Sequence, residues 1–329
     1  MPNMTAYKRP NEIFPEPPVS WVQGNPAGPP LVVIVGPTGS GKSSLALELA
    51  AKSRGAIISA DSRQIYRGFD IGTATPTSAE QSRVAHDLIS VTEPNRVYTV
   101  SDFQTDALQA LERRRKEGYL PFLVGGTGLY VKALLDGLTI PPQAPDPALR
   151  QTLAALPDPH ASLAQVDPET AHRLHPNDRF RIIRALEVFH LTGIPISAQQ
   201  KSRPCPYRLL MIGLAANRQD LYARIDARVS QMLQNGFVDE VQSLADRWGW
   251  DLPLLRTLGY AEIGAYLRGE LSCDEASSLM AQHTRNYAKR QLTWFRADPR
   301  IRWLIRETGA SDADVYEKAA SWLRAWAQA

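Results

Sequence analysis

The sequence predicts an α/β protein with a doubly wound parallel sheet as its core and a helical lobe inserted into that core. Short apolar segments alternate with segments of helical spacing within residues 31–139 and again within 206–306. This alternation is typical of the strands and crossover helices of a parallel sheet. Residues 140–205 instead combine short helical segments with many prolines, and we expect those at 141, 142, 145, 147, 157 and 159 to break the helices. This composition indicates the inserted lobe.

The first half of the core begins at residues 31–35, Leu-Val-Val-Ile-Val, which are apolar and β-branched without alternation. Such a run is typical of a strand buried on both faces. Residues 43–52 are rich in Ala, Leu and Glu and favour a helix. We expect a second strand at 55–61, a helix at 101–117 and a third strand at 120–124.

The remaining elements follow from the same periodicities. In the lobe, residues 178–191 are expected to form a helix. Residues 208–214 read as a strand that returns to the sheet. Beyond it we expect helices at 218–235, 238–248, 254–267 and 274–295, a strand at 301–305, and a C-terminal helix within 307–329.

The N-terminal segment 1–30 contains eight prolines. This density excludes a regular helix or a central strand, so we expect a flexible segment that catalysis does not need.

Composition narrows the class of protein. Hydrophobic residues make up 43% and charged residues 22% of 329 positions, as in folded globular proteins. Cys205 and Cys273 lie far apart without a Cys or His partner nearby, which argues against a zinc cluster or a disulfide framework. The first twenty residues contain no apolar leader core, and no apolar run is long enough to cross a membrane. We expect a cytoplasmic monomer that does not enter membranes.

A phosphate-binding loop follows the first strand directly and precedes the first helix. Its sequence fits the pattern GxxxxGK[ST], and this strand-to-helix context is the one in which a P-loop works. Backbone N–H groups and the helix N-terminus attract phosphate oxygens, the lysine bridges them, and the last serine can hold Mg²⁺. We therefore predict a nucleotide-kinase-like polyphosphate site formed by Gly36, Pro37, Thr38, Gly39, Ser40, Gly41, Lys42 and Ser43.

The loop alone does not select the polyphosphate, because its contacts reach only phosphate and metal. ATP and other nucleotides therefore remain possible ligands. A hydrolytic switch needs an acidic residue at the end of a second strand. The strand at 120–124 ends in Gly-Gly-Thr instead, which argues against hydrolysis.

Charge is unevenly distributed, although the net charge is only +3. Residues 173–184 and 285–306 are both rich in arginine and contain few acids. Either stretch alone is explained by a solvated helix face. Two such stretches in one chain also fit the binding of a phosphate backbone.

Seven sequence blocks together resemble the bacterial tRNA dimethylallyltransferase family. The blocks occur in one order between residues 31 and 303: GPTGSGKS, ISADSRQIYRGFDIGTATP, LVGGTGLYVKALLDGL, HPNDRFRIIRALEV, ARIDARV, LRTLGYAEIGAYLRGE and TRNYAKRQLTWFR. The resemblance implies transfer of a dimethylallyl group from its diphosphate to N6 of the adenosine 3′ of the anticodon, position 37. It further implies tRNAs that read codons beginning with U, with pyrophosphate released.

The resemblance also implies catalytic roles. The P-loop and Arg224 would hold the diphosphate, with Mg²⁺ at Ser43. Asp61, at the end of the second strand, would guide and deprotonate the adenine amine. Thr127 would lie near the reacting centre. Without the resemblance, Arg224 could form a helix-surface ion pair with Asp220 or Asp226, Asp61 could be an ordinary strand-end residue, and Thr127 could cap a helix.

The target base must leave its stack before it can react. By resemblance, the residues that touch the flipped base or the anticodon strand are Asp61, Ser62, Arg63, Gln64, Thr127, Arg181 and Arg184. The chain departs from the family pattern at Thr75, where the family usually has Lys, and at Phe180, where it commonly has Gln. These departures put a basic contact and a hydrogen bond in question.

Three other functions remain open on the residues alone. A small-molecule kinase would place ATP in the same loop and could use residues 179–184 as a mobile lid. A prenyltransferase acting on free AMP would need neither the lobe nor the basic C-terminal stretch. An RNA-binding switch would need the hydrolytic acid that the sequence does not provide.

Overall fold

The computed structural model describes residue 14 and residues 20–141 and 145–329. The chain forms two compact units, one of residues 1–131 and 206–329 and the other of residues 132–205. The second unit begins at Lys132 rather than at the expected residue 140, so that helix α5 (Gly128–Leu135) spans the boundary. None of the helices among the described residues is long and apolar enough to cross a membrane.

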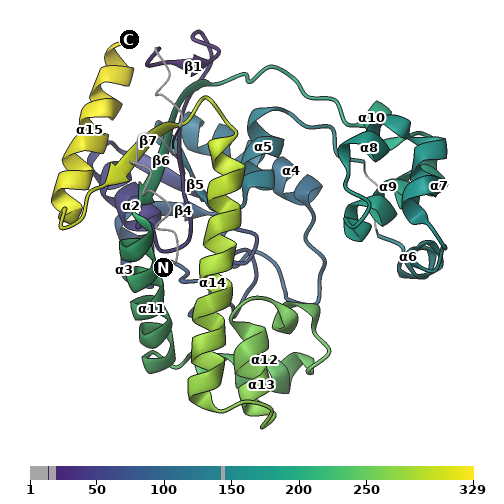
Figure 1. The fold of residues 1–329 in the computed structure, drawn as a ribbon. Coiled ribbons are helices and arrows are strands. Elements are labelled where there is room, and N and C mark those ends of the chain that lie inside the picture. The colour runs from purple at the N-terminus through teal and green to yellow at the C-terminus, as the bar shows by residue number, and fades with distance from the viewer. Residues whose placement is uncertain (1–13, 15–19, 142–144) are drawn as a thin grey trace, which may run out of the picture. The chain divides into compact units, whose positions relative to one another are not determined.

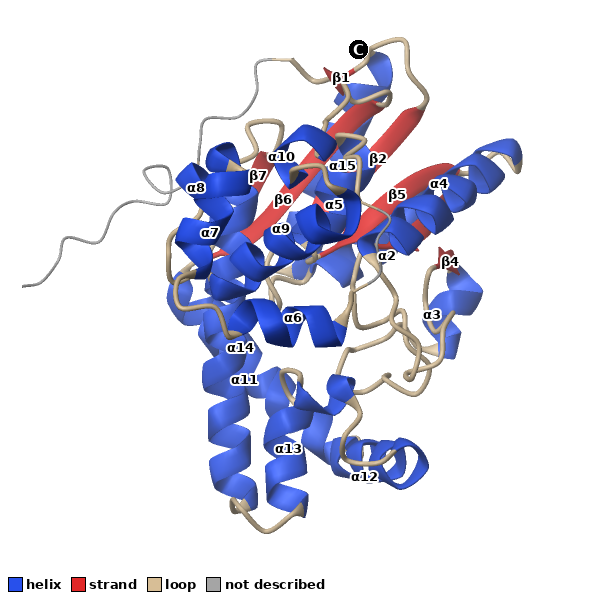
Figure 2. Ribbon diagram, turned by 90° about the vertical axis from the view of Figure 1, so that its right-hand side faces the viewer, coloured by secondary structure: helices blue, strands red, loops and turns tan. Residues whose placement is uncertain are grey.

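The first unit contains a seven-stranded sheet (Figure 2). Its strands are β1 (Gln23–Gly24), β2 (Pro30–Val35), β3 (Gly55–Ser59), β4 (Ala85–Asp87), β5 (Leu120–Gly125), β6 (Arg208–Ala216) and β7 (Arg302–Arg306). They lie in the order β1-β6-β2-β5-β3-β4, with β7 also paired to β6. All pairs are parallel except β1 with β6. The five expected strands are confirmed; β1 and β4 are too short to have given a signal.

Helices cover both faces of this sheet (Figure 1). Those of the first unit are α2 (Lys42–Lys52), α3 (Ser78–Arg83), α4 (Val100–Lys116), α11 (Arg218–Gln234), α12 (Phe237–Trp248), the 3-10 helix η1 (Pro253–Arg256), α13 (Tyr260–Leu267), α14 (Cys273–Arg296) and α15 (Asp312–Gln328). The expectation of one helix at 254–267 is wrong. Gly259 adopts a φ of 87°, which ends the first helical turn and lets α13 begin in a new direction.

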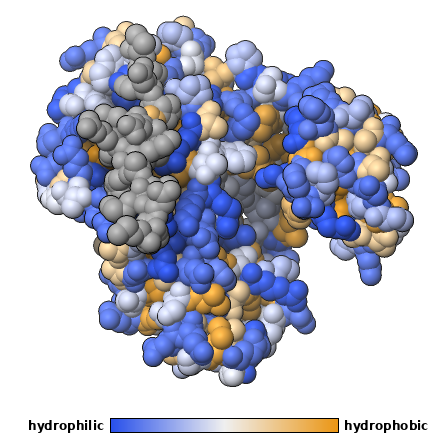
Figure 3. Space-filling view, in the orientation of Figure 1, coloured by the Kyte–Doolittle hydropathy of each residue, from blue (hydrophilic) through white to orange (hydrophobic). Residues whose placement is uncertain are grey.

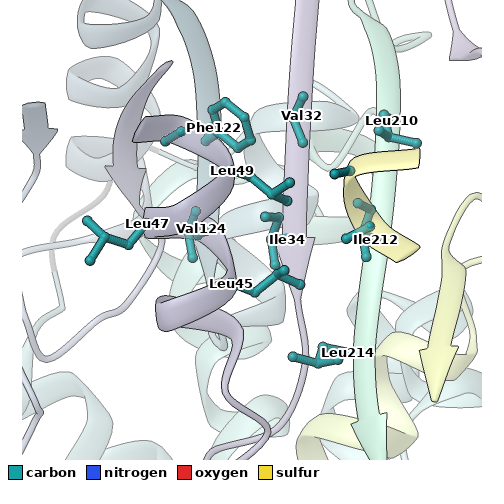
Figure 4. Packing of buried hydrophobic residues seen from close by; sticks show 14 of the residues in the cluster. Val32, Ile34, Leu45, Leu47, Leu49, Phe122, Val124, Leu210, Ile212 and Leu214 are labelled. Carbon is teal, nitrogen blue, oxygen red and sulfur yellow. The ribbon is translucent and has the colours of Figure 1, made fainter. Parts of the chain in front are cut away.

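Alternate residues of the central strands form the core on one side of the sheet. Figure 4 shows Leu45, Leu47 and Leu49 of α2 packed against this face. The facing strand residues come from three neighbouring strands and include Val32, Ile34, Phe122, Val124, Leu210, Ile212 and Leu214. The intervening residues are equally buried, which explains the absence of polar alternation in these strands.

The expected flexible segment 1–30 needs correction in its described part. Gln23 and Gly24 pair with β6, and the Asn25 backbone N–H donates to the Tyr207 carbonyl at 2.9 Å. The guanidinium of Arg302 lies 4.0 Å from the ring centre of Trp21. Residues 19–25 contain no proline, so an edge pairing is possible there. Residues 1–13 and 15–19 lie outside the described residues.

The second unit is helical. It contains α6 (Pro147–Ala154), α7 (Pro159–Val166), α8 (Pro168–Arg173), α9 (Arg179–Thr192) and α10 (Ile196–Gln199). Pro147 and Pro159, which were expected to break helices, instead begin two of them, and Pro168 begins a third. Each is preceded by an aspartate cap: Asp146, Asp158 and Asp167. Proline suits the first helical position because its missing N–H would have no partner there. Leu163, Ile182 and Val188 lie in this unit's core.

The strand register places three loops at one edge of the sheet. Val35 of β2 pairs with Gly125 of β5, and Ser59 of β3 pairs with Val124. The carboxyl ends of β2, β5 and β3 are therefore level. In open α/β sheets, ligands bind outside this edge.

Candidate active site

The P-loop turns from β2 into α2 through glycines in the left-handed region. Gly39 has a φ of 84° and Gly41, the residue that precedes α2, has a φ of 91°. L-residues with side chains adopt this conformation at a cost, which explains glycine at both positions. Lys42 and Ser43 then occupy the first turn of a helix of 11 residues, where the helix N-terminus favours an anion.

Lys42 carries the charge that the loop offers to a ligand. Its Nζ lies 3.5 Å from the Pro37 carbonyl oxygen. Burial lowers the pKa of Lys42 to about 8; Asp61 counteracts this shift, and the positive charge of Arg228 adds to it. An anion bound beside Lys42 would restore the charged form.

A glutamine of α14 fastens the P-loop to the neighbouring strand. The Thr38 backbone N–H donates to Oε1 of Gln291 at 2.8 Å, and Nε2 of Gln291 donates to the Gly126 carbonyl at 3.0 Å. Gln291 is buried. The block TRNYAKRQLTWFR contains this residue, but nothing in its spacing indicated the contact.

Asp61 and Thr127 follow β3 and β5 and lie in turns that are bonded to one another. Oδ1 of Asp61 accepts a hydrogen bond from the Arg63 backbone at 2.8 Å. Oγ1 of Thr127 accepts one from the Ser62 backbone at 3.1 Å, and the Thr127 backbone donates to the Ala60 carbonyl at 3.2 Å. The structure thus brings together Asp61, Ser62 and Thr127, as the sequence predicted.

Two hollows of the first unit meet at Thr38, Asp61, Thr73 and Arg228. The first hollow is lined by the end of the P-loop and by polar and apolar side chains. Its lining includes Lys42, Ser43, Gln64, Ala46, Leu47 and Ile57. The second has a volume of about 1070 Å³ including its open mouth. Its lining includes Ser62, Arg63, Tyr287, Arg290, Ile225, Val229, Met232 and Met280. The arrangement has a phosphate-binding side and a larger, partly apolar side, with Asp61 between them.

Arg228 is a site residue that the sequence reasoning missed. It lies one helical turn after Arg224 on α11, and its Nη2 is 3.5 Å from the Thr73 carbonyl oxygen. Burial lowers the pKa of Arg228, and the negative charge of Asp61 opposes that shift. The four-residue spacing from Arg224 could have signalled it, because such residues share one face of a helix.

Arg224 lies beside the P-loop. A Cβ atom built on Gly41 would be 3.4 Å from its Nη1. The alternative ion pairs with Asp220 or Asp226 are not formed: Nη2 of Arg224 is 3.9 Å from Oδ1 of Asp312, and Asp226 pairs with Arg285.

The side-chain amide of Gln64 joins the end of β3 to the turn at Thr73 and Ala74. Its Oε1 accepts from the Ser59 hydroxyl at 2.9 Å, while Nε2 donates to the carbonyls of Thr73 and Ala74 at 3.3 and 3.1 Å. At Thr75, where the family usually has lysine, the hydroxyl lies 2.9 Å from the Thr73 hydroxyl. The threonine therefore contributes to the turn rather than to a basic contact.

Arg181 and Arg184 belong to α9 of the second unit. Nη1 of Arg181 bonds to Asp178 at 2.7 Å, and its side chain is exposed. Nη1 of Arg184 bonds to the buried Glu187 at 2.6 Å. Phe180, directly before Arg181, is 75% exposed. Arg181 and Phe180 are therefore exposed to a ligand surface, whereas Arg184 also holds the core of its unit.

The expected basic surface lies along α14. Figure 3 shows mainly hydrophilic residues over this helix. Its cations include Arg285, Lys289, Arg290 and Arg296. Arg218, Arg285 and Lys289 surround the ring of Tyr222 within about 6 Å. Cations grouped around an aromatic ring can contact both phosphates and bases.

Comparison with known proteins identifies the family. A family model described as IPP transferase matches residues 64–298, and one described as isopentenyl transferase matches residues 29–90. The chain belongs to the IPP transferase family. A tRNA dimethylallyltransferase of Synechococcus is 50% identical over 283 residues, which cover 85% of this chain and 92% of that protein. A tRNA dimethylallyltransferase of Crocosphaera subtropica is 50% identical over 295 residues, 89% and 97% of the two chains.

Solved structures of related transferases share the fold. The full-length tRNA isopentenylpyrophosphate transferase of Bacillus halodurans gives a TM-score of 0.68 at 38% identity, over 91% of this chain and 98% of that one. A eukaryotic dimethylallyltransferase acting on tRNA gives 0.75 at 27% identity, over 90% and 77%. The mixed α/β architecture and the resemblance inferred from seven blocks are thus confirmed.

Proposed function

We propose that this protein transfers a dimethylallyl group from dimethylallyl diphosphate to N6 of adenosine 37 in tRNAs that read codons beginning with U, and releases pyrophosphate. Family membership supports the reaction class. The observation that carries the proposal is the meeting of the two hollows at Asp61, between a P-loop and a larger recess. Donor and acceptor can approach one carboxylate from opposite sides.

The donor occupies the first hollow. We propose that the loop 36–43 acts as a P-loop of the nucleotide-kinase type that holds diphosphate rather than ATP. Lys42, Arg224 and Arg228 surround the position at which negative charge grows as the bond from C1 to the diphosphate oxygen breaks. Donors aimed at developing charge contribute about 3 kcal/mol each to lowering such barriers. The guanidinium groups therefore stabilise the leaving group more strongly than the bound substrate.

The acceptor adenine enters the second hollow. Asp61 accepts a hydrogen bond from the N6 amine and receives its proton as the new C–N bond forms. Flipping the base out costs a few kcal/mol. Side chains in the recess offset this cost, with Tyr287 available for stacking and Arg63 and Arg290 for phosphates. Ser62 and Thr127 align the turn that carries Asp61.

The site fits a magnesium ion held mainly by substrate. Within the described residues no group of three or more His, Cys, Asp or Glu could hold a metal. Mg²⁺ commonly keeps several waters and binds through substrate phosphates with few protein ligands. The Ser43 hydroxyl, at the start of α2, is the protein oxygen that suits this arrangement. When bound, the ion would neutralise charge on the diphosphate.

The second unit provides the remaining tRNA contacts in this proposal, through Arg181 and, where its ion pair allows, Arg184. We further propose that the protein acts as a monomer in the cytoplasm, as the sequence led us to expect.

A direct assay tests the proposal. The protein is incubated with Mg²⁺, dimethylallyl diphosphate and unmodified tRNA, and the nucleosides are analysed by mass spectrometry. We expect one prenylated adenosine per tRNA and pyrophosphate in equal amount. Prenylation of free AMP instead of tRNA, or phosphoryl transfer from ATP to a metabolite without use of the prenyl donor, would contradict the proposal.

A further inference from the structure

A single carboxylate outside the two hollows holds the turn 70–72. Oε2 of Glu240, on α12, accepts hydrogen bonds from the backbone N–H groups of Asp70 at 3.1 Å and Ile71 at 2.6 Å. Oε1 accepts from the Gly72 N–H at 3.1 Å and from the Tyr260 hydroxyl at 2.7 Å. Hydrogen bonds to an ionised acceptor are about twice as strong as neutral ones. Both oxygens of Glu240 are therefore committed to this turn and its support.

The other side of the same turn faces the site. The Thr73 carbonyl accepts hydrogen bonds from Nε2 of Gln64 and, at 3.5 Å, from Nη2 of Arg228. Gly72 and Thr73 both line the second hollow, and Thr73 also lines the first. The backbone that Glu240 fixes at residues 70–72 is thus followed directly by the carbonyl that contacts the buried guanidinium.

Packing keeps this turn from shifting independently. A Cβ atom at Gly72 would lie 2.4 Å from Phe237 and 2.6 Å from Tyr260, so the backbone rests against α12 and α13 without a side chain between them. The packing leaves no gap beside Gly72 that could absorb a change at Glu240. Such a change must therefore move the turn relative to the site.

We propose that Glu240 is a positioning residue for the transfer reaction: it fixes the turn 70–72 so that the Thr73 carbonyl orients the guanidinium of Arg228 between Asp61 and the P-loop. Glu240 contacts neither substrate in this account. The inference rests on the proposed function, because it assigns Arg228 to the leaving diphosphate. It extends that function to a residue outside both hollows.

The first test replaces Glu240 with glutamine, which keeps the shape but presents an NH₂ group to backbone donors. Small misplacements near reacting atoms cost up to about a hundredfold in rate. We expect kcat for tRNA prenylation to fall about tenfold or more, with KM for tRNA changed less than about threefold. Asp246→Asn serves as the control, because Asp246 lies on the same helix and bonds to Gln242; its kcat should equal that of the wild type.

A double-mutant cycle separates positioning from simple loss of stability. Residues that act through one another show non-additive effects. We expect Glu240→Gln to lower kcat in the wild-type background but by less than about twofold in an Arg228→Ala background. Equal effects in both backgrounds would overturn the inference. So would a Glu240→Gln enzyme with wild-type kcat.

A milder variant covers the case in which Glu240→Gln does not fold. Tyr260→Phe removes one of the four donors to Glu240 and keeps the ring. We expect kcat to fall about threefold, again only when Arg228 is present; an unchanged kcat overturns the inference. If the wild-type protein fails to prenylate tRNA, the proposed function itself is wrong. If the wild type is active and the variants have unchanged kcat, only the role of Glu240 is wrong.

Discussion

Two carboxylates in this protein each face two cations, in opposite surroundings. Glu187 of the second unit is fully buried and accepts hydrogen bonds from Arg150 at 2.9 Å and Arg184 at 2.6 Å. Asp61 of the first unit is partly exposed between Lys42 and Arg228, at the meeting point of two hollows. The first carboxylate is enclosed by its partners, and the second has space for a ligand.

The surroundings determine what each cluster does. Burial opposes ionisation of Glu187, but hydrogen bonds from Arg150 and Arg184 nevertheless lower its pKa. Near Asp61 it is the cations whose pKa values fall, because burial removes water from Lys42 and Arg228, and the negative charge of Asp61 only opposes this shift. Unneutralised positive charge is suited to binding an anion. The enclosed cluster around Glu187 therefore stabilises the fold, and the open cluster around Asp61 is suited to ligand binding and catalysis.

The sharpest test of this contrast is Asp61→Ala. Loss of a proton acceptor typically costs about 10² to 10⁴ in rate, so we expect turnover to fall about a thousandfold while tRNA binding is largely retained. Single-turnover assays and filter binding measure the two quantities. Asp251→Ala, an exposed aspartate outside both hollows and outside the turn 70–72, is the control and should keep full turnover. Full turnover in Asp61→Ala would remove this residue from the mechanism.

Glu187→Gln should instead lower the stability of the fold. Removing one member of a buried ion pair leaves uncompensated charge and costs about 3 kcal/mol of unfolding free energy. Denaturant unfolding of the variant measures this loss. Glu169→Gln, at an exposed position of α8, should change stability by less than about 0.5 kcal/mol. If Glu187→Gln is as stable as the wild type, the cluster of Glu187, Arg150 and Arg184 does not stabilise the second unit.

Lys42→Ala sharpens the comparison on the donor side. Removing a group that stabilises developing charge costs about a hundredfold or more in rate. We expect kcat/KM for dimethylallyl diphosphate to fall by that factor while tRNA affinity is unchanged. Lys52→Ala, at the far end of α2, is the matched control. An equal loss in both variants would point to damage of the helix rather than to the phosphate site.

The smallest expected effect is on pH dependence. The pKa of Lys42 is lowered from 10.5 to about 8 in the folded protein. Above that pH the free enzyme loses the ammonium charge, so kcat/KM for the donor should decline several-fold by about pH 9. Lys42→Arg, which stays charged, should lack this decline. A decline that persists in Lys42→Arg would assign it to another group.

The same shift makes an opposite prediction for stability. Between about pH 8 and 10.5 the unfolded chain holds the Lys42 proton and the folded chain does not. Folding is then favoured as the pH rises, so the contribution of Lys42 to the unfolding free energy of the ligand-free protein increases across this window. Comparing the wild type with Lys42→Met isolates this contribution.

Most of the sheet could be predicted from sequence because its strands are buried on both faces and therefore uniformly apolar. β4 could not, since three residues, Ala-His-Asp, carry no periodicity. The break between η1 and α13 was missed because the pattern of 254–267 is helical throughout; it depends on the backbone of Gly259. The prolines of the second unit were read as breakers, although the preceding aspartates mark them as helix starts.

For the site, a local motif predicted the P-loop, and the family resemblance implied Asp61 and Thr127 at the ends of two further strands. Their register follows from the parallel sheet. Gln291, Arg228 and Glu240 were not predicted, because each acts through contacts with residues more than a hundred positions away. The spacing from Arg224 could have indicated the helix face of Arg228, but the contacts of all three residues depend on how α11, α12 and α14 pack, which the sequence does not reveal.

The bridge made by Gln291 has a consequence for biosynthesis. Thr38 cannot form its hydrogen bond until Gln291, 253 residues later in the chain, has been translated. In the same way, β2 lacks its neighbour β6 until residues 208–216 have been translated. At about 5 to 20 residues per second, the nascent loop spends on the order of 10 to 50 s without this bridge. The hydrogen bond that fixes the phosphate-binding loop to α14 can therefore form only late in synthesis, once 291 of the 329 residues have been joined.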